Sequence, residues 1–399
     1  MTQQQLERIQ ETLRTLGLGA WLLYNFRDSN PIASRMLGIP AGGHQTRRWA
    51  YLIPADGTPR GIGHRIEPHI SALMQGDVRQ YSSHAEFRDG LQWLAEGHDA
   101  VAMEYSPCNA VPVVSRVDAG TIELVRSLGV DVVTSADLIA HLEARLTDEQ
   151  IASACRAGAA VREIVTDAFR TIRDCVAGGR RCTEFDVQQF MLGEFARRGL
   201  VTDHAPNCSV GPNSANPHYE PTESGAAEIH AGDFVLIDLW AREDAEGSIF
   251  GDITWVGFVG EDVPSRCAEV FAVVRDARDA AFERVRDAFS RGEKVTGAEL
   301  DDAARDVIIR AGYGSCFTHR TGHSITTELH GAGANLDNFE TMDTRTILPA
   351  TSFSIEPGIY LPGEFGIRSE LDVVIDAGGS VMATSEPLQQ EVVAIMALQ

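Results

Sequence analysis

The chain has 399 residues, of which 44% are apolar, so it is long enough to form two globular domains. No apolar run reaches the roughly 18–20 residues of a membrane-spanning helix, and a formal net charge of −23 argues against a nucleic-acid partner, because phosphate binding requires a basic surface. The seven cysteines form no CxxC pair, which argues against a disulfide framework and favours the reducing cytoplasm.

Residues 1–145 are expected to form an α/β domain. The N-terminal stretch MTQQQLERIQETLRTLG has the spacing of an amphipathic helix. Short apolar runs then alternate with helical segments, which is the pattern of an α/β fold. The expected strands are residues 20–25, 49–54, 101–105 and 130–135, and the helices between them lie near 84–96 and 135–145.

A second domain is expected over residues 146–399, and its elements occur twice. The first set begins with TDEQ at Thr147, a capping-box spacing that starts a long helix, and Thr183 caps a shorter helix. The second set begins at Ser265, and its shorter helix is capped by Thr296, 113 residues after Thr183. Strand-like segments follow each pair of helices, at 233–241 and 251–260 and then at 351–361 and 366–375. Although such an order can arise by chance, the ordered offset of 113 to 118 residues predicts an α+β domain with an internal duplication.

Acidic residues recur with a similar offset. Asp238 and Asp252 are 14 residues apart on successive predicted strands, and Glu356 and Glu370 are also 14 apart. Each glutamate follows its aspartate counterpart by 118 residues. Taken singly, each acid could cap a strand or face solvent. Two facing hairpins would instead gather four carboxylates, which repel one another unless cations neutralise them.

The stretch THRTGHSITTELHG, residues 318–331, concentrates three of the twelve histidines: His319, His323 and His330. Each could be a lone surface histidine, but beside four acids one imidazole can bind a metal and the others can contact a reacting carbonyl. Oxygen ligands with one imidazole suit Mn²⁺, Co²⁺, Fe²⁺ or Zn²⁺. Two such ions can share carboxylates and lower the pKa of a bridging water enough to give hydroxide near neutral pH. HRTGH is not the helical HExxH pattern, so a zincin is not expected.

Five motifs follow one another along the second part of the chain. They are GPNSANPHY (211–219), IDLWA with GDITW (237–241 and 251–255), HRTGHSI (319–325), SIEPGIY (354–360) and GIRSELDVV (366–374). With these motifs in this order, the chain resembles the pita-bread metallopeptidases, among them prolidase, aminopeptidase P, creatinase and methionine aminopeptidase. The resemblance covers the whole chain. It implies a creatinase-type α/β domain over residues 1–145 and a pita-bread catalytic domain over residues 146–399.

The resemblance implies a dinuclear metal site. The family's five metal ligands carry over as Asp238, Asp252, His323, Glu356 and Glu370. Asp252 and Glu370 would bridge two divalent ions, with Mn²⁺ expected and Zn²⁺ or Co²⁺ as alternatives. Glu356 would also be the general base beside a metal-bridging hydroxide nucleophile. His330 would stabilise the tetrahedral intermediate or contact the substrate carbonyl, and His319 is expected to assist catalysis from behind the ligands or from the pocket wall.

The resemblance also implies residues that bind the substrate. His218, in the PHY motif, would line the pocket together with His330. Arg368 lies two residues before Glu370, on the same strand face, and would pair with the carboxylate of a C-terminal proline, unless it only balances the nearby acids. The loop YNFRDSNPIASRMLG occupies a position that often reaches an active site in this family, so its Asp28 or Arg27 would bind the amino end of the substrate and close the cleft to longer peptides, unless the loop is simply solvated.

These expectations favour a cytoplasmic, homodimeric prolidase, which hydrolyses the Xaa-Pro bond of dipeptides. Aminopeptidase P, which acts on longer peptides with proline second, is the alternative, because the choice depends on how the two substrate ends are recognised. A metal-free relative that only binds peptides is disfavoured, because all five ligand positions carry suitable side chains. The expected partner is therefore an Xaa-Pro dipeptide, with no nucleic acid and no membrane.

Overall fold

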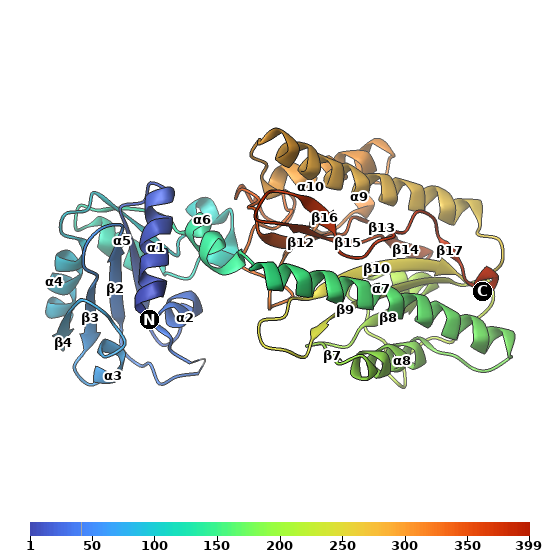
Figure 1. The fold of residues 1–399 in the computed structure, drawn as a ribbon, viewed down its shortest axis with the longest axis horizontal. Helices are drawn as coiled ribbons and strands as arrows, with labels where there is room; N and C mark the ends of the chain where they lie inside the picture. The colour runs from blue at the N-terminus through green and yellow to red at the C-terminus, as the bar shows by residue number, and fades with distance from the viewer. Residues whose placement is uncertain (41) are drawn as a thin grey trace. The chain divides into compact units, whose positions relative to one another are not determined.

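The computed structural model describes residues 1–40 and 42–399 (Figure 1). These residues form two compact units, Met1–Leu142 and Glu143–Gln399. The boundary expected between residues 145 and 146 lies close to this division, whereas the identity of the two domains stays a prediction. In the described part of the chain, no helix is both long and apolar enough to cross a membrane.

A six-stranded mixed sheet organises the first unit, with the strand order β4-β3-β2-β1-β5-β6. The strands are β1 (Ala20–Asn25), β2 (Trp49–Pro54), β3 (Arg60–His64), β4 (Asp77–Tyr81), β5 (Ala100–Met103) and β6 (Asp131–Thr134). Both β1 and β2 are buried along their whole length, as their continuous apolar runs predict. The sequence did not predict the strands β3 and β4. Their sequences, RGIGH and DVRQY, show little alternation of apolar and polar residues, and β4 is a largely exposed edge strand.

Helices cover this sheet and complete its core. They are α1 (Gln3–Thr15), α2 (Pro31–Leu37), α3 (Pro68–Ser71), α4 (His84–Ala95), α5 (Ala119–Arg126) and α6 (Ala136–Ile139). Phe87 and Leu91 of α4 and Ile122 of α5 pack with the apolar residues of the strands. The predicted α/β class of the first part is therefore confirmed.

The second unit contains two pairs of helices, each followed by antiparallel strands. The helices are α7 (Asp148–Ala177), α8 (Glu184–Arg197), α9 (Ser265–Arg291) and α10 (Gly297–Arg310). The strands are β7 (Leu200–Val201), β8 (Asn207–Val210), β9 (Phe234–Glu243), β10 (Gly251–Phe258), β11 (Ser324–Ile325), β12 (Thr351–Ile355), β13 (Gly358–Leu361), β14 (Phe365–Arg368), β15 (Leu371–Ile375), β16 (Val381–Ala383) and β17 (Val393–Ala394). Because β9 pairs with β10 and β12 pairs with β15, the predicted internal duplication is confirmed.

Each repeat packs its helices against its own strands. Phe169 of α7 and Val187 of α8 share a core with Ile237 of β9. In the second repeat, Val274 of α9 packs in a core with Phe353 of β12. The long helices α7 and α9 run along the strands (Figure 1). Packing against these helices therefore holds the strands that carry the acids in place.

The strand predicted over residues 351–361 is divided at Glu356 and Pro357. Pro357 has no N–H to donate to a neighbouring strand. The N–H of Glu356 donates instead to the carbonyl oxygen of Thr321 at 2.7 Å. The structure therefore contains two short strands, β12 and β13, where the sequence predicts one.

The partner strand has a matching gap at Glu370. Its N–H donates to the carbonyl oxygen of Thr254, in the other repeat, at 3.2 Å. Beyond the gap, Gly358 pairs with Arg368, so the register of β12 and β15 continues through β13 and β14. Glu356 and Glu370 consequently lie opposite each other where the ladder is interrupted.

Candidate functional site

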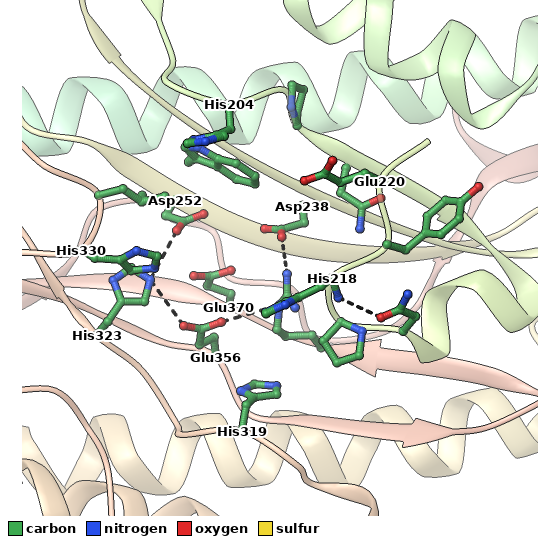
Figure 2. Close-up of a pocket in the computed structure, with 18 of the residues that line it drawn as sticks. His204, His218, Glu220, Asp238, Asp252, His319, His323, His330, Glu356 and Glu370 are labelled. Carbon is green, nitrogen blue, oxygen red and sulfur yellow. Dashed lines mark hydrogen bonds and ion pairs between the residues drawn. The ribbon is translucent and has the colours of Figure 1, made fainter. Parts of the chain in front are cut away.

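The acids of the first hairpin project from one face of its sheet. Asp238 of β9 lies directly opposite Thr254 of β10, and Asp252 precedes Thr254 by two residues. Because alternate residues of a strand point to the same face, the three side chains project together. Thr254 Oγ1 lies 3.1 Å from Asp238 and 2.7 Å from Glu370, so this hydroxyl joins the two hairpins. Figure 2 shows Asp238, Asp252, Glu356 and Glu370 gathered around one space.

His323 points its Nε2 atom at these acids. Nε2 lies 3.7 Å from Asp252 and 3.5 Å from Glu356. Nδ1 lies 3.3 Å from the carbonyl oxygen of Ser324, and since a carbonyl only accepts, the ring proton belongs on Nδ1. Burial lowers the pKa of His323 well below its usual range, so the ring is neutral and its Nε2 lone pair faces carboxylate oxygens. That arrangement is unfavourable unless a cation lies between them.

Two buried carboxylate oxygens of the site lack hydrogen-bond partners, which also indicates that the site is built for a cation. Asp252 Oδ1 and Glu370 Oε1 accept no hydrogen bond from the residues that the structure describes. Burial, followed by the neighbouring carboxylates, raises the pKa of both acids well above the usual range. Ligand atoms of Asp252, His323 and Glu370 lie within 4.8 Å of one another. This donor set fits a divalent metal, which would satisfy the unpartnered atoms and neutralise the charge.

Arg368 is buried beside the acids and has partners for all three of its nitrogens. Nη2 pairs with Asp238, Nε donates to Thr254 Oγ1 at 2.8 Å, and Nη1 lies 3.4 Å from the Tyr360 hydroxyl. Nε also lies 3.8 Å from Glu356. In this arrangement Arg368 balances the acids with three of its five N–H donors.

His319 is held by hydrogen bonds at both ring nitrogens. Nδ1 lies 2.7 Å from the carbonyl oxygen of Arg320, and Nε2 lies 2.7 Å from the Tyr360 hydroxyl. Burial lowers the pKa of His319 to about 4, so the ring is neutral near pH 7. Its Nε2 therefore accepts a hydrogen bond from the Tyr360 hydroxyl. Figure 2 shows His319 set apart from the acids, on the far side of Glu356. The structure thus shows His319 bracing Tyr360, and its catalytic role stays a prediction.

His330 and His218 line the same cavity of about 890 Å³ as the acids. The ring of His330 packs edge-on against His323, with 4.4 Å between centroids. His218 approaches from the other side of the acids (Figure 2). Both histidines keep solvent-exposed surface, so both can meet a ligand that enters the cavity.

Asp28 lies in the first unit, between β1 and α2. Its backbone is left-handed, with φ of 60°. Its carboxylate accepts hydrogen bonds from Ser34 Oγ at 2.7 Å and Gln45 Nε2 at 3.1 Å. These bonds brace its own loop. Asp28 belongs to the first unit and the acids to the second, and contact between Asp28 and a substrate stays a prediction.

Two residues that the sequence did not single out take part in the site. Thr254 and Asp372 each follow a predicted metal ligand, Asp252 and Glu370 respectively, by two residues. The two-residue period of a strand therefore contained the signal that could have found them. Asp372 Oδ2 accepts the N–H of Asp252 at 2.6 Å, which fixes the backbone of that acid.

Glu184, which the sequence also left unmarked, fixes the cavity wall that carries His218. Its side chain lies at the start of α8 and is fully buried. It accepts four hydrogen bonds, from Val210 N–H (2.8 Å), Asn213 Nδ2 (2.9 Å), the Tyr219 hydroxyl (2.5 Å) and Ala227 N–H (2.7 Å). All four donors belong to residues 210–227, so one carboxylate ties this segment to the helix.

Replacing Glu184 with glutamine should loosen this wall. One carboxylate oxygen becomes an NH₂ group, which cannot accept the two hydrogen bonds that this oxygen accepts in the wild type. Hydrogen bonds to charged groups contribute about 1.5–3 kcal/mol, so the amides of Val210 and Ala227 should exchange about tenfold faster or more. Amide hydrogen exchange measures this rate. The exposed Glu223→Gln, in the same segment, is the control and should leave both amides protected. Unchanged exchange in Glu184→Gln would show that other contacts hold the wall.

Comparison with known proteins agrees with the geometry of the site. The model of metallopeptidase family M24 matches residues 149–377. The probable dipeptidase PepE of Mycobacterium tuberculosis is 29% identical over 368 residues, which span 88% of this chain and 86% of that protein. The Xaa-Pro dipeptidase of Lactobacillus helveticus is 34% identical over 161 residues, or 40% of this chain and 39% of that protein.

A solved structure is similar along almost the whole chain. The crystal structure of dipeptidase PepE from Mycobacterium ulcerans superposes with a TM-score of 0.65 at 23% identity. The match covers 98% of this chain and 97% of that one. At this identity the likeness shows the fold.

Proposed function

Because the chain belongs to metallopeptidase family M24 and is a hydrolase of that family, we propose that it cleaves the Xaa-Pro bond of dipeptides with the help of two divalent metal ions. The cluster of Asp252, His323 and Glu370 carries this proposal, because a neutral imidazole lone pair and two unpartnered carboxylate oxygens converge in one cavity. The names of the dipeptidase relatives support the substrate class.

The metal ligands of the proposed enzyme are the five residues named from the sequence: Asp238, Asp252, His323, Glu356 and Glu370. When bound, two divalent ions would polarise the scissile carbonyl and lower the pKa of the attacking water. Carboxylate oxygens with one imidazole suit Mn²⁺, and Zn²⁺ or Co²⁺ are alternatives. Asp252 and Glu370 would each offer the ions an oxygen that has no hydrogen-bond partner among the described residues.

Glu356 is the proposed general base. It would accept a proton from the attacking water and return it to the proline nitrogen as the C–N bond breaks. Its orientation is fixed, because Ser354 Oγ lies 3.1 Å from Oε1 and its own N–H is bonded to Thr321. The carboxylate is therefore held toward the cavity by two contacts that do not involve the substrate.

The histidines have distinct proposed roles. His330, beside His323 and open to the cavity, would donate to the carbonyl oxygen as negative charge develops there. His218 would contact the substrate from the wall that Glu184 holds. His319 would act through Tyr360, whose hydroxyl it binds.

Further parts of the proposal rest on the resemblance alone. They are the division of the two domains between residues 145 and 146, a cytoplasmic homodimer, and a contact of Asp28 with the amino end of the substrate. Asp28 would have to exchange its bonds to Ser34 and Gln45 to make that contact.

Aminopeptidase P is the second candidate. The cavity of about 890 Å³ favours it, because a dipeptide is small for a pocket at the upper end of the usual range of about 300–1,000 Å³. Room for a longer peptide would therefore exist beside the acids.

Hydrolysis of Ala-Pro and Ala-Pro-Ala, side by side on protein stripped of metal and reloaded with Mn²⁺, tests the proposed function. We expect cleavage of Ala-Pro that depends on Mn²⁺ and slower cleavage of Ala-Pro-Ala. A preference for the tripeptide would identify an aminopeptidase P. Failure to cleave either peptide with two metals bound would reject the substrate class while leaving the metal site in place.

A further inference from the structure

Carboxylates dominate the cavity that holds the site. Seven of its described lining residues are aspartate or glutamate, whereas only two are arginine and none is lysine. Four of these acids are the proposed metal ligands, whereas Asp203, Glu220 and Glu340 are not, and these three would repel the C-terminal carboxylate of a peptide unless a cation received it. The identity of that cation therefore decides which peptides the cavity accepts.

Arg368 is poorly placed to receive this carboxylate. Its Nε donates to Thr254 and its two Nη atoms contact Tyr360 and Asp238, so only one N–H of each Nη atom remains for a ligand. Turning the guanidinium toward a ligand would leave Asp238 buried without its ion-pair partner, which is costly. The contacts of Arg368 instead suit a residue that holds the acids in place.

Arg320, the other arginine of the cavity, has a fixed backbone and a free side chain. It stands between His319 and Thr321, whose carbonyl and N–H groups are bonded to Arg305 at 2.7 Å and to Asp301 at 2.9 Å. The half-buried guanidinium of Arg320 makes no hydrogen bond or ion pair with any residue in 1–40 or 42–399. Its charge is therefore available to a ligand.

The surroundings of Arg320 place this charge near the reacting groups. Glu340 lies beside it, but a Glu340 oxygen accepts the backbone N–H of Arg320 at 2.9 Å rather than pairing with the guanidinium. Arg320 lines the cavity together with His319, His330 and Glu356.

We propose that Arg320 binds the α-carboxylate of the substrate's C-terminal residue and thereby selects dipeptides. A guanidinium presents parallel N–H donors that match both carboxylate oxygens. A longer peptide replaces this carboxylate with a neutral amide and loses the charge-assisted hydrogen bonds. The inference rests on the proposed Xaa-Pro dipeptidase function and names the residue that gives it specificity.

Calorimetric titration of the Mn²⁺-loaded protein with L-proline and L-prolinamide tests Arg320 without turnover. The two ligands differ in the carboxylate, and the acidic cavity alone would favour the cationic prolinamide. We expect the wild type to bind L-proline about ten- to a hundredfold more tightly, and Arg320→Met to lose this preference. Arg320→Lys should keep part of it, because the charge remains while the paired donors are lost.

Arg310→Met, which replaces an exposed arginine outside the cavity, is the matched control and should bind both ligands as the wild type does. The inference would be overturned if the wild type failed to prefer L-proline, or if Arg320→Met kept the preference. Loss of the preference in Arg368→Met but not in Arg320→Met would assign the carboxylate to Arg368 instead. Hydrolysis of Ala-Pro by the wild type separately reports whether the proposed function holds.

Discussion

Glu356→Gln should lower kcat for Ala-Pro by a factor of about 10²–10⁴, the usual contribution of a positioned general base. Glutamine has nearly the same shape and keeps an oxygen that can accept the hydrogen bond from Ser354. The fold and the cavity should therefore persist, while the group that accepts a proton from water is lost. Steady-state kinetics at saturating Mn²⁺ measures this effect.

Metal content must be measured on the same samples, because Glu356 is also a proposed ligand. Glu220→Gln is the matched control, since Glu220 lines the same cavity and is exposed. It should keep kcat within a few-fold of the wild type. Turnover at the wild-type rate in Glu356→Gln, with both metals bound, would reject Glu356 as the base.

Glu370→Gln should have opposite effects on stability with and without metal. In the metal-free protein, Glu370 is a buried acid beside Asp252, and burial followed by this neighbour raises its pKa well above the usual range. Removing the acid should raise the melting temperature by several degrees at neutral pH. With Mn²⁺ present the variant should melt below the wild type, because it loses ligand-linked stabilisation.

The effect of Glu370→Gln on the stability of the metal-free protein should depend on pH. The folded protein holds a proton on Glu370 that the unfolded chain has released, so stability from this group is complete below the ordinary glutamate pKa and is lost as pH rises through the raised value. The stabilisation by Glu370→Gln in metal-free protein should therefore be absent in acid and grow toward neutral pH. Thermal melts at several pH values between acid and neutral measure this stabilisation. The exposed Glu261→Gln is the control, and its melting temperature should stay close to that of the wild type. A metal-free variant less stable than the wild type at neutral pH would mean that Glu370 is not held as an unneutralised acid.

Local sequence patterns predicted the positions of the main elements well. Capping boxes at Thr147, Thr183 and Thr296 precede helices that begin at the next residue. A capping box involves only four consecutive residues, so it can be recognised from the sequence alone. The offset between the two repeats also predicted which acids would converge. Short strands such as β4 remained hidden, because an exposed edge strand has little apolar signal.

The partners of the long side chains could not be predicted from the sequence. Strand periodicity places Arg368 on the face of Glu370 but does not reveal that its guanidinium is committed to Asp238, 130 residues earlier. The sequence likewise shows Glu184 only as a residue in a first helical turn. Its four donors come from a loop whose path depends on the whole fold.

The interrupted hairpin has a consequence for any attempt to divide this domain. The N–H of Glu370 bonds to Thr254 of the other repeat, and the N–H of Asp252 bonds to Asp372 across the same boundary. An isolated half would therefore lack the other half's acids and the acceptors for these backbone N–H groups, one a carbonyl oxygen and the other a carboxylate. Two halves expressed as separate polypeptides should acquire tight metal affinity only on mixing, so that reassembly and metal capture would be one cooperative event.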